Sequence, residues 1–240
     1  MPKKKVYSKI FLWVIALGLV AGAAFAANAL STPKPAGNPV MTLWAVIASG
    51  GVSIIVLGLV SIAAVASVIY HFKYVTFEKL VPRDFTENLM ALLEKKEYDK
   101  AISVCRQQEN MISAIALNGL KKMSRGKGAV EQAIQYEGKK RIEQLWQNLS
   151  YLGDIAVVAP MLGLLGTIFG MIDAFNFFKA GTVHPGILTQ GLAKAMINTA
   201  FGLIIAVPAL VFYSYFRGRV SAITTAAETT SSEIIQTVAK

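Results

Sequence analysis

The sequence contains little charge, one cysteine and two histidines, and each of these shortages excludes a class of protein. Charged residues make up 16% of the 240 residues and hydrophobic residues 54%, which is the wrong balance for an ordinary soluble domain. The single cysteine, Cys105, cannot form a disulfide within the chain. His71 and His184 fall in separate segments, so we expect no metal cluster and interpret each as an interfacial side chain. These shortages favour a membrane protein without a bound metal.

Motifs that carry chemistry are also missing. The chain has no nucleotide-binding loop, no nucleophile elbow and no paired catalytic carboxylates. We therefore predict no catalytic residues, no cofactor and no enzymatic activity.

The net charge of +10 does not indicate nucleic acid as a partner. Much of this charge lies beside apolar segments, and the polar stretch 73–149 balances fourteen basic residues with ten acidic ones. Attraction of the flanking lysines and arginines to the anionic headgroups of a lipid bilayer explains the charge more simply.

Four long apolar runs organise the chain. The first, within residues 1–29, follows a lysine-rich start and ends in small residues, which is typical of a secretory signal peptide, although an uncleaved anchor helix would fit as well. Residues 30–39 then form a periplasmic linker. The other three runs predict transmembrane helices at 40–72, 151–178 and 187–216, each longer than the roughly 20 residues that cross a bilayer.

Basic residues orient these helices. Residues 73–150 hold fourteen of the twenty-four lysines and arginines, so they are predicted to be a cytoplasmic insertion, whereas 179–186 is a short periplasmic loop and 217–240 a cytoplasmic C-terminal helix. Within the insertion, helical patterns occur at 82–96, 98–107 and 111–123, and from residue 129 one pattern runs unbroken into the second membrane helix. The predicted fold is an all-α membrane protein with three transmembrane helices and long cytoplasmic helical extensions.

The second membrane helix carries a pattern of small residues. Gly163, Gly166 and Gly170 have the spacing that lets helix backbones approach closely in a membrane. Thr167 in this helix and Thr199 in the third are expected at similar depth, because a short loop joins the two helices. Their hydroxyl groups can orient water or contact a carboxylate, or each can bond back to a carbonyl of its own helix.

Charged and amide side chains lie toward the outer ends of the same two helices. Asp173 and Lys194 are each about 8 Å outward of the nearest threonine, at roughly 1.5 Å per residue, and an ion pair between them is one interpretation. Gln190, Lys194 and Asn198 form one polar stripe, because they are four residues apart. One interpretation is that this stripe lines a subunit interface or a wet vestibule. The other is that it is the solvated end of the helix, with the Lys194 side chain snorkelling to the membrane interface.

Two longer motifs resemble a known family. The pattern A-P-x-x-G-L-x-G-T-x-x-G-M-x-x-A-F at 159–175 and the segment G-L-A-K-A-M-I-N-T-A-F-G-L-I-I-A-V-P-A at 191–209 are similar to the ExbB/TolQ/MotA proton-channel family, and most to its ExbB branch. The likeness includes Pro160, Pro208 and Gly202.

This resemblance implies a pentameric stator in the bacterial inner membrane around an ExbD-like dimer. Thr167 and Thr199 would face the proton path, the titrating carboxylate would belong to the partner, and the work would pass to a TonB-like protein. A TolQ-like envelope stator or a motility stator is the alternative within the family. Lys194, where relatives often carry glutamate, is the best support for a third alternative, a structural scaffold that conducts nothing.

Overall fold

A computed structural model describes residues 51–179 and 185–239. The predicted signal peptide or anchor at 1–29, the linker at 30–39, the first part of the 40–72 helix and most of the 179–186 loop, with His184, lie outside the described residues.

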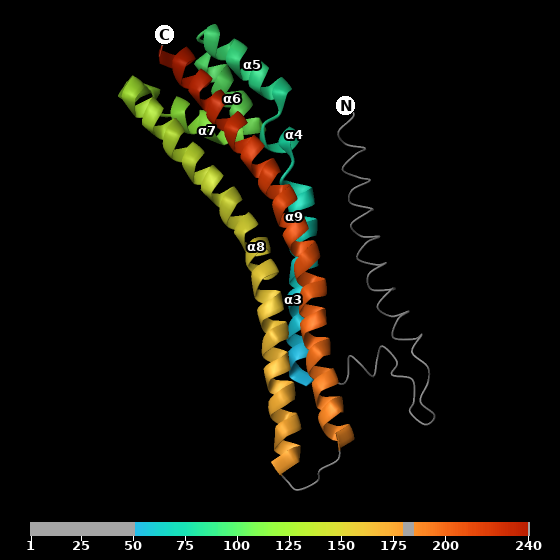
Figure 1. The fold of residues 1–240 in the computed structure, drawn as a ribbon. Coiled ribbons are helices and arrows are strands. Elements are labelled where there is room, and N and C mark those ends of the chain that lie inside the picture. The colour runs from blue at the N-terminus through green and yellow to red at the C-terminus, as the bar shows by residue number, and fades with distance from the viewer. Residues whose placement is uncertain (1–50, 180–184, 240) are drawn as a thin grey trace. The chain divides into compact units, whose positions relative to one another are not determined.

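The described residues are helical, with no β-strand in 51–179 or 185–239. The helices are α3 (Gly51–Tyr74), α4 (Phe77–Leu80), α5 (Arg83–Glu94), α6 (Tyr98–Gln107), α7 (Met111–Leu120), the 3₁₀ helix η1 (Met123–Arg125), α8 (Lys127–Lys179) and α9 (Pro185–Ala239) (Figure 1). The all-helical fold is as predicted. The helix expected at 111–123 ends at Leu120, three residues early, and the 3₁₀ helix η1 follows from Met123.

Within residues 51–179 and 185–239, three helices are long and apolar enough to cross a membrane: Ser53–Tyr74 in α3, Lys127–Asp173 in α8 and Gly191–Val238 in α9. α8 begins at Lys127, so the helix that starts near residue 129 runs without a break into the second membrane helix, as predicted. α9 extends to Ala239, so the third membrane helix continues into the C-terminal helix. Pro160 and Pro208 lie inside these helices without ending them. A proline leaves one carbonyl of the preceding turn without its backbone donor.

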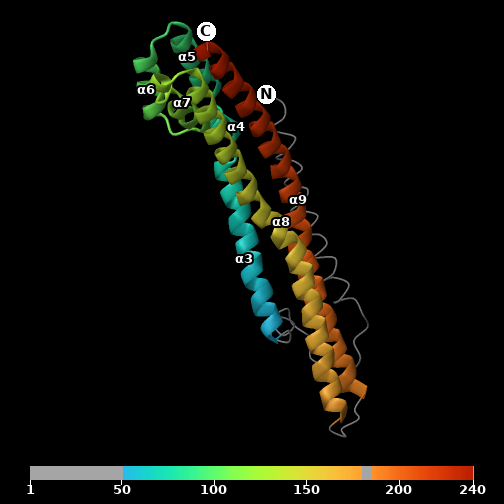
Figure 2. The ribbon, with the colours of Figure 1, turned by 90° about the vertical axis from the view of Figure 1, so that its left-hand side faces the viewer.

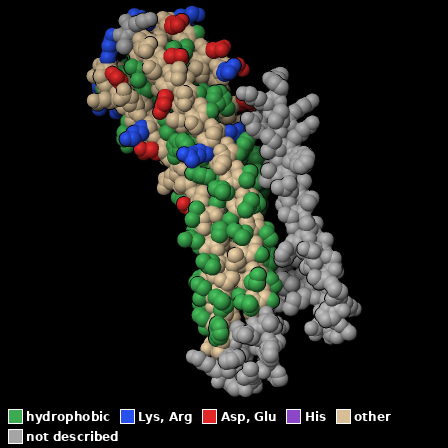
Figure 3. Space-filling view, in the orientation of Figure 1, with side chains coloured by type: hydrophobic (Ala, Val, Ile, Leu, Met, Phe, Trp, Pro, Cys, Tyr) green, Lys and Arg blue, Asp and Glu red, His purple; other side chains and the backbone are tan. Residues whose placement is uncertain are grey.

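The chain divides into two compact units. We call one the apolar unit; its described residues are 51–64, 154–179 and 185–210. We call the other the charged unit, residues 65–153 and 211–239. On the face that Figure 3 shows, hydrophobic side chains cover the apolar unit, and lysine, arginine and acidic side chains gather on the charged unit.

Short amphipathic helices build much of the charged unit. In α5, Phe85, Leu89 and Leu93 recur every four residues and are all buried, so the helix has one apolar face. α6 packs against both α5 and α7. Asn110 begins α7 with a capping box, in which its side chain accepts from the Ser113 backbone N–H at 2.7 Å and satisfies a donor left free at the helix end.

The C-terminal part of α9 completes the core of this unit. Val220, Ile223, Ile234 and Val238 are buried, so this part of α9 has one apolar face. A buried carboxylate, Glu137, joins neighbouring helices. It accepts from Asn118 of α7 at 3.1 Å and from Arg141 at 2.8 Å.

His71 differs from its expected place at an interface. Its side chain is 1% exposed and its ring lies 5.2 Å from the Phe216 ring, centroid to centroid. Nδ1 donates to the Ser67 carbonyl at 2.7 Å. The position in the last turn of an apolar helix suggested an interface, but the sequence does not reveal that the aromatic side chains of α9 cover this turn.

Candidate functional site

The glycines of α8 lie directly against the backbone of α9 within the apolar unit. A Cβ atom added at Gly163 would lie 2.8 Å from the carbonyl oxygen of Asn198 and 3.1 Å from the Cα of Thr199. Both neighbours are backbone atoms, so no rotamer change can make room. α8 and α9 run side by side here in both ribbon views (Figures 1 and 2).

The contact extends in both directions along the two helices. A Cβ at Gly202 would lie 2.7 Å from the Ala159 carbonyl oxygen, and one at Gly170 would lie 3.0 Å from the Cβ of Ala195. The pairs run in opposite order along the two helices, so the helices are antiparallel. The predicted small residues therefore form one continuous helix–helix contact, as small residues do in membranes.

Pro160 belongs to the same contact. Its Cα would lie 3.3 Å from a Cβ at Gly202, so the proline-containing turn of α8 packs directly on the glycine of α9. Pro208 lies two turns further along α9 and is half-buried. Ala159 and Ala195, both buried, were missed as contact residues, and the signal that could have found them is the same small-residue spacing continued on each helix.

The two threonines differ in their hydrogen bonds. Thr167 Oγ1 donates to the Leu164 carbonyl of its own helix at 2.6 Å, which is the local alternative of the sequence analysis. Thr199 Oγ1 instead points across the contact and donates to the Gly163 carbonyl over a long 3.5 Å. Since Gly163 faces Thr199, the two hydroxyl groups lie within about one helical turn, roughly 5 Å along the axis.

Asn198 occupies the centre of the contact. Its side chain is 4% exposed, and its Nδ2 atom would lie 2.7 Å from a Cβ at Gly166. The polar stripe of the sequence analysis is thus directed into the α8–α9 contact at this residue.

The other polar candidates lie further along the two helices. The Asp173 side chain is exposed in the single chain, while for Gln190 and Lys194 the structure describes only the backbone, which is part of α9. The ion pair between Asp173 and Lys194 therefore stays a prediction. Gly170 faces Ala195, so the backbones of Asp173 and Lys194 lie within about one turn of the same level.

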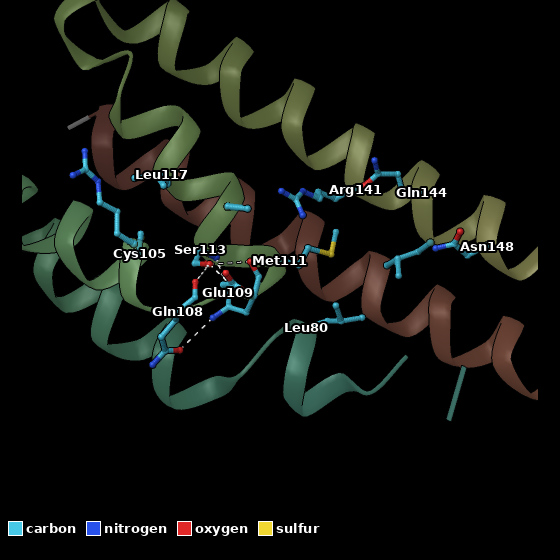
Figure 4. A pocket seen from close by; sticks show the side chains of 14 residues that line it. Leu80, Cys105, Gln108, Glu109, Met111, Ser113, Leu117, Arg141, Gln144 and Asn148 are labelled. Atoms are coloured by element: carbon cyan, nitrogen blue, oxygen red, sulfur yellow. Dashed lines mark hydrogen bonds between the residues drawn. The ribbon is translucent and has the colours of Figure 1, made fainter. Parts of the chain in front are cut away.

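The charged unit contains a separate pocket of about 600 Å³. Figure 4 shows its lining from α6, α7, α8 and the loop between α6 and α7, including Arg141, Gln144 and Asn148 of α8. Cys105 lies at its edge and is buried, and burial raises the pKa of the thiol from 9.0 to about 11. A thiol with that pKa stays protonated and unreactive at neutral pH.

Nothing in the described segments resembles a metal centre, because no three His, Cys, Asp or Glu side chains in 51–179 or 185–239 come together. The candidate site is the α8–α9 contact, which places a hydroxyl and an amide among glycines inside apolar helices. This arrangement defines a class: multi-pass membrane proteins whose helices pack through small residues around intramembrane polar groups.

The chain belongs to the MotA/TolQ/ExbB proton channel family, whose profile matches residues 107–229. The match covers both motifs at 159–175 and 191–209 and all of α7 and α8. The predicted family is therefore confirmed, and the glycine contact between α8 and α9 lies inside the matched region.

Several curated relatives are named for the same family. The chain is 31% identical over 128 residues to the putative biopolymer transport protein ExbB homolog of Methanothermobacter thermautotrophicus, covering 53% of this chain and 46% of the relative. It is 24% identical over 202 residues to biopolymer transport protein ExbB of Pseudomonas putida, covering 79% and 60%. It is 35% identical over 95 residues to the Tol-Pal system protein TolQ of Haemophilus influenzae, covering 38% and 41%. The matches thus span between about two fifths and three fifths of these relatives.

Proposed function

We propose that this chain is an ExbB-like subunit of a proton-driven motor in the bacterial inner membrane. With an ExbD-like single-span partner it uses the proton motive force to energise TonB-dependent transport across the outer membrane, through a TonB-like protein. The observation that carries the proposal is the α8–α9 contact. Here the Thr199 hydroxyl lies against the Gly163 carbonyl, within the two motifs that carry the family resemblance.

The proposed topology follows from the charges. The N-terminus is periplasmic after removal of residues 1–29, the charged unit is cytoplasmic, and α9 ends in the cytoplasm. The distribution of charge supports this proposal, because the polar stretch 73–149 holds fourteen of the twenty-four lysines and arginines and positive residues mark the cytoplasmic side.

The chemistry of the site suits proton transfer by a partner's carboxylate. A threonine hydroxyl both donates and accepts hydrogen bonds and keeps its charge unchanged, so Thr167 and Thr199 can hold water beside a titrating group without competing for the proton. One elementary charge that moves through 100 mV releases about 2.3 kcal/mol. In the proposed pentamer around two partner helices, each proton delivered to the carboxylate drives one step of relative movement.

Lys194 calls for a compensating anion in this scheme, because an unpaired cation near the path repels incoming protons. We propose that Asp173 supplies it, since both residues lie near the level of the Gly170–Ala195 contact. Lys194→Ala should then reduce transport more than the double change to alanine at both residues. Equal losses of transport in the single and double variants would show that Asp173 and Lys194 do not form a functional ion pair.

A TolQ-like envelope stator is a second candidate, favoured by the similarity to the Haemophilus influenzae TolQ protein. A motility stator would use the same membrane chemistry. A scaffold that conducts no protons is favoured by Lys194 alone. These candidates differ in their partners and in proton flux.

The test is native mass spectrometry of the detergent-extracted complex after co-expression with a neighbouring gene for a single-span protein. The proposal expects a complex of five copies of this chain with two of the partner, and a subunit that begins near Ala27 or Leu30. A homo-oligomer that takes up no partner would favour the scaffold.

A further inference from the structure

The side chain of Asn198 carries a polar atom that the packing of α8 and α9 leaves unused. Its Oδ1 atom is enclosed by protein and has no hydrogen-bond partner within the described residues. The whole residue is 4% exposed. A buried acceptor without a donor destabilises the arrangement that contains it, and such atoms are few in native structures.

Among the side chains that the structure describes, none offers Asn198 Oδ1 a donor. It faces Gly166, which has no side chain, and the backbone N–H groups of α8 are used within the helix. A buried leucine or alanine would fill the same place without an unpaired atom. The asparagine therefore stabilises the helix contact less than an apolar residue would, and its amide points to a ligand.

The size of the ligand follows from the spacing of the helices. The Nδ2, Cβ and Cγ atoms of Asn198 would lie 2.7, 2.8 and 3.0 Å from a Cβ at Gly166, so no side chain of α8 fits between them. A water molecule is a small donor that can pair with Oδ1. It reaches this enclosed atom only when α8 and α9 separate slightly.

The hydrogen bond between α9 and α8 beside Asn198 is weak. The adjacent hydroxyl, Thr199 Oγ1, donates to the Gly163 carbonyl at 3.5 Å, at the long limit of a hydrogen bond. When this bond opens, the Thr199 hydroxyl and Asn198 Oδ1, which both face α8, become available to water together. Two or more polar partners are what an internal water needs.

We infer that Asn198 is a water-binding residue beside the proton path, and that the described arrangement of α8 and α9 is its closed state. The inference rests on the proposed function, because it assigns the water to the path that Thr199 serves. Asn198 acts as a positioning residue: its amide oxygen holds the water that the Thr199 hydroxyl orients.

The test compares two variants of nearly equal size in the complex with its single-span partner, reconstituted in liposomes under a pH gradient. Asn198→Ser keeps a small polar group and should retain proton flux within about twofold, whereas Asn198→Ala should lower it about tenfold. Met196→Leu is the control, because Met196 is 67% exposed on the same helix, and it should leave the flux unchanged. Equal flux in the serine and alanine variants would overturn the inference.

Heat stability gives a second readout that does not depend on conduction. Asn198→Leu removes the unpaired acceptor and keeps the number and branching of the side-chain heavy atoms, so its complex should unfold at the same temperature as the wild type or higher, while its flux falls with that of Asn198→Ala. A leucine variant that conducts as the wild type does would show that the amide is only a packing group.

Lys194 lies one turn before Asn198 in α9 and is a different source of a donor. If water rather than Lys194 is the donor to Asn198 Oδ1, removing the lysine does not alter the effect of residue 198. Asn198→Leu should then change the unfolding temperature equally in the wild-type and Lys194→Met backgrounds. An unequal change would assign the donor to Lys194 and overturn the water site. A wild-type complex that passes no protons would refute the proposed function itself, whereas flux that ignores residue 198 would refute this inference alone.

Discussion

The apolar unit and the charged unit bury opposite kinds of residue. Between α8 and α9 the apolar unit encloses glycine, alanine and one asparagine, and it exposes large apolar side chains such as Met161, Leu164 and Leu203. The charged unit encloses Leu89, Ile112 and other large side chains and carries charges outside. In lipid, burying leucine brings no gain, so close backbone approach stabilises helix contacts; in water, the same burial stabilises a core.

Leu89→Ala, a cavity in the charged unit, has the largest expected effect. Leu89 is fully buried in α5, and leucine-to-alanine changes in cores cost about 2–5 kcal/mol. We expect the free energy of unfolding in detergent, followed by circular dichroism, to fall by this amount. A loss below about 1 kcal/mol would mean that this unit is not held by a close-packed core.

Cys105 tests whether the interior of the charged unit excludes water. Burial raises the pKa of its thiol from 9.0 to about 11, so at pH 8 the thiolate is roughly a hundredfold scarcer than in the unfolded chain. Alkylation of the native complex should be slower by about that factor. Because the unfolded thiol ionises first, stability should also fall as the pH rises from about 9 to about 11. Cys105→Ser should remove the thiol's contribution to this pH dependence, and alkylation of the native complex at the unfolded rate would show that water reaches Cys105.

Gly163→Ala tests the glycine contact of the apolar unit. The new methyl group would meet two backbone atoms of α9 at 2.8 and 3.1 Å, so the helices must separate, at a cost of about 1–3 kcal/mol. We expect a lower unfolding temperature and loss of proton flux, measured in the same reconstituted complex. An unchanged unfolding temperature and unchanged proton flux would show that the close approach of α8 and α9 at Gly163 contributes neither to stability nor to conduction.

Gly218→Ala is the matched control, with the smallest expected effect. A Cβ at Gly218 has no atom within 4 Å, and alanine favours a helix over glycine by about 1 kcal/mol or less. Stability should therefore stay the same or rise slightly. A loss of stability as large as that of Gly163→Ala would mean that α9 tolerates no alanine even where there is space. The effect of Gly163→Ala could then not be attributed to the glycine contact.

The sequence predicted the long helices and the glycine face well, because each depends on local spacing. Gly163, Gly166 and Gly170 are recognisable three and four residues apart, and the amphipathic pattern of α5 is similarly local. The burial of His71 was not predictable, since it depends on Phe216, which is far away in the sequence and contacts it only through the fold.

The hydrogen bonds and burial of the polar residues of the site could not be predicted from the sequence either. Thr167 and Thr199 look equivalent in the two motifs, yet one bonds within its own helix and the other across the contact. The rotation of each helix about its axis decides this, and a hydropathy pattern does not fix that rotation. Asn198 was predicted as part of a polar stripe, but its enclosure against Gly166 required the packed structure.

The measurement that tests the account most directly is proton flux through the complex of this chain with its single-span partner in liposomes, for the wild type and for Thr199→Val. Valine has nearly the shape of threonine without the hydroxyl group, so the contact with Gly163 should survive. If the Thr199 hydroxyl serves the proton path, proton uptake should fall by about tenfold or more from the wild type to the variant. Equal flux in the two, or none in the wild type, would contradict a proton path at the α8–α9 contact.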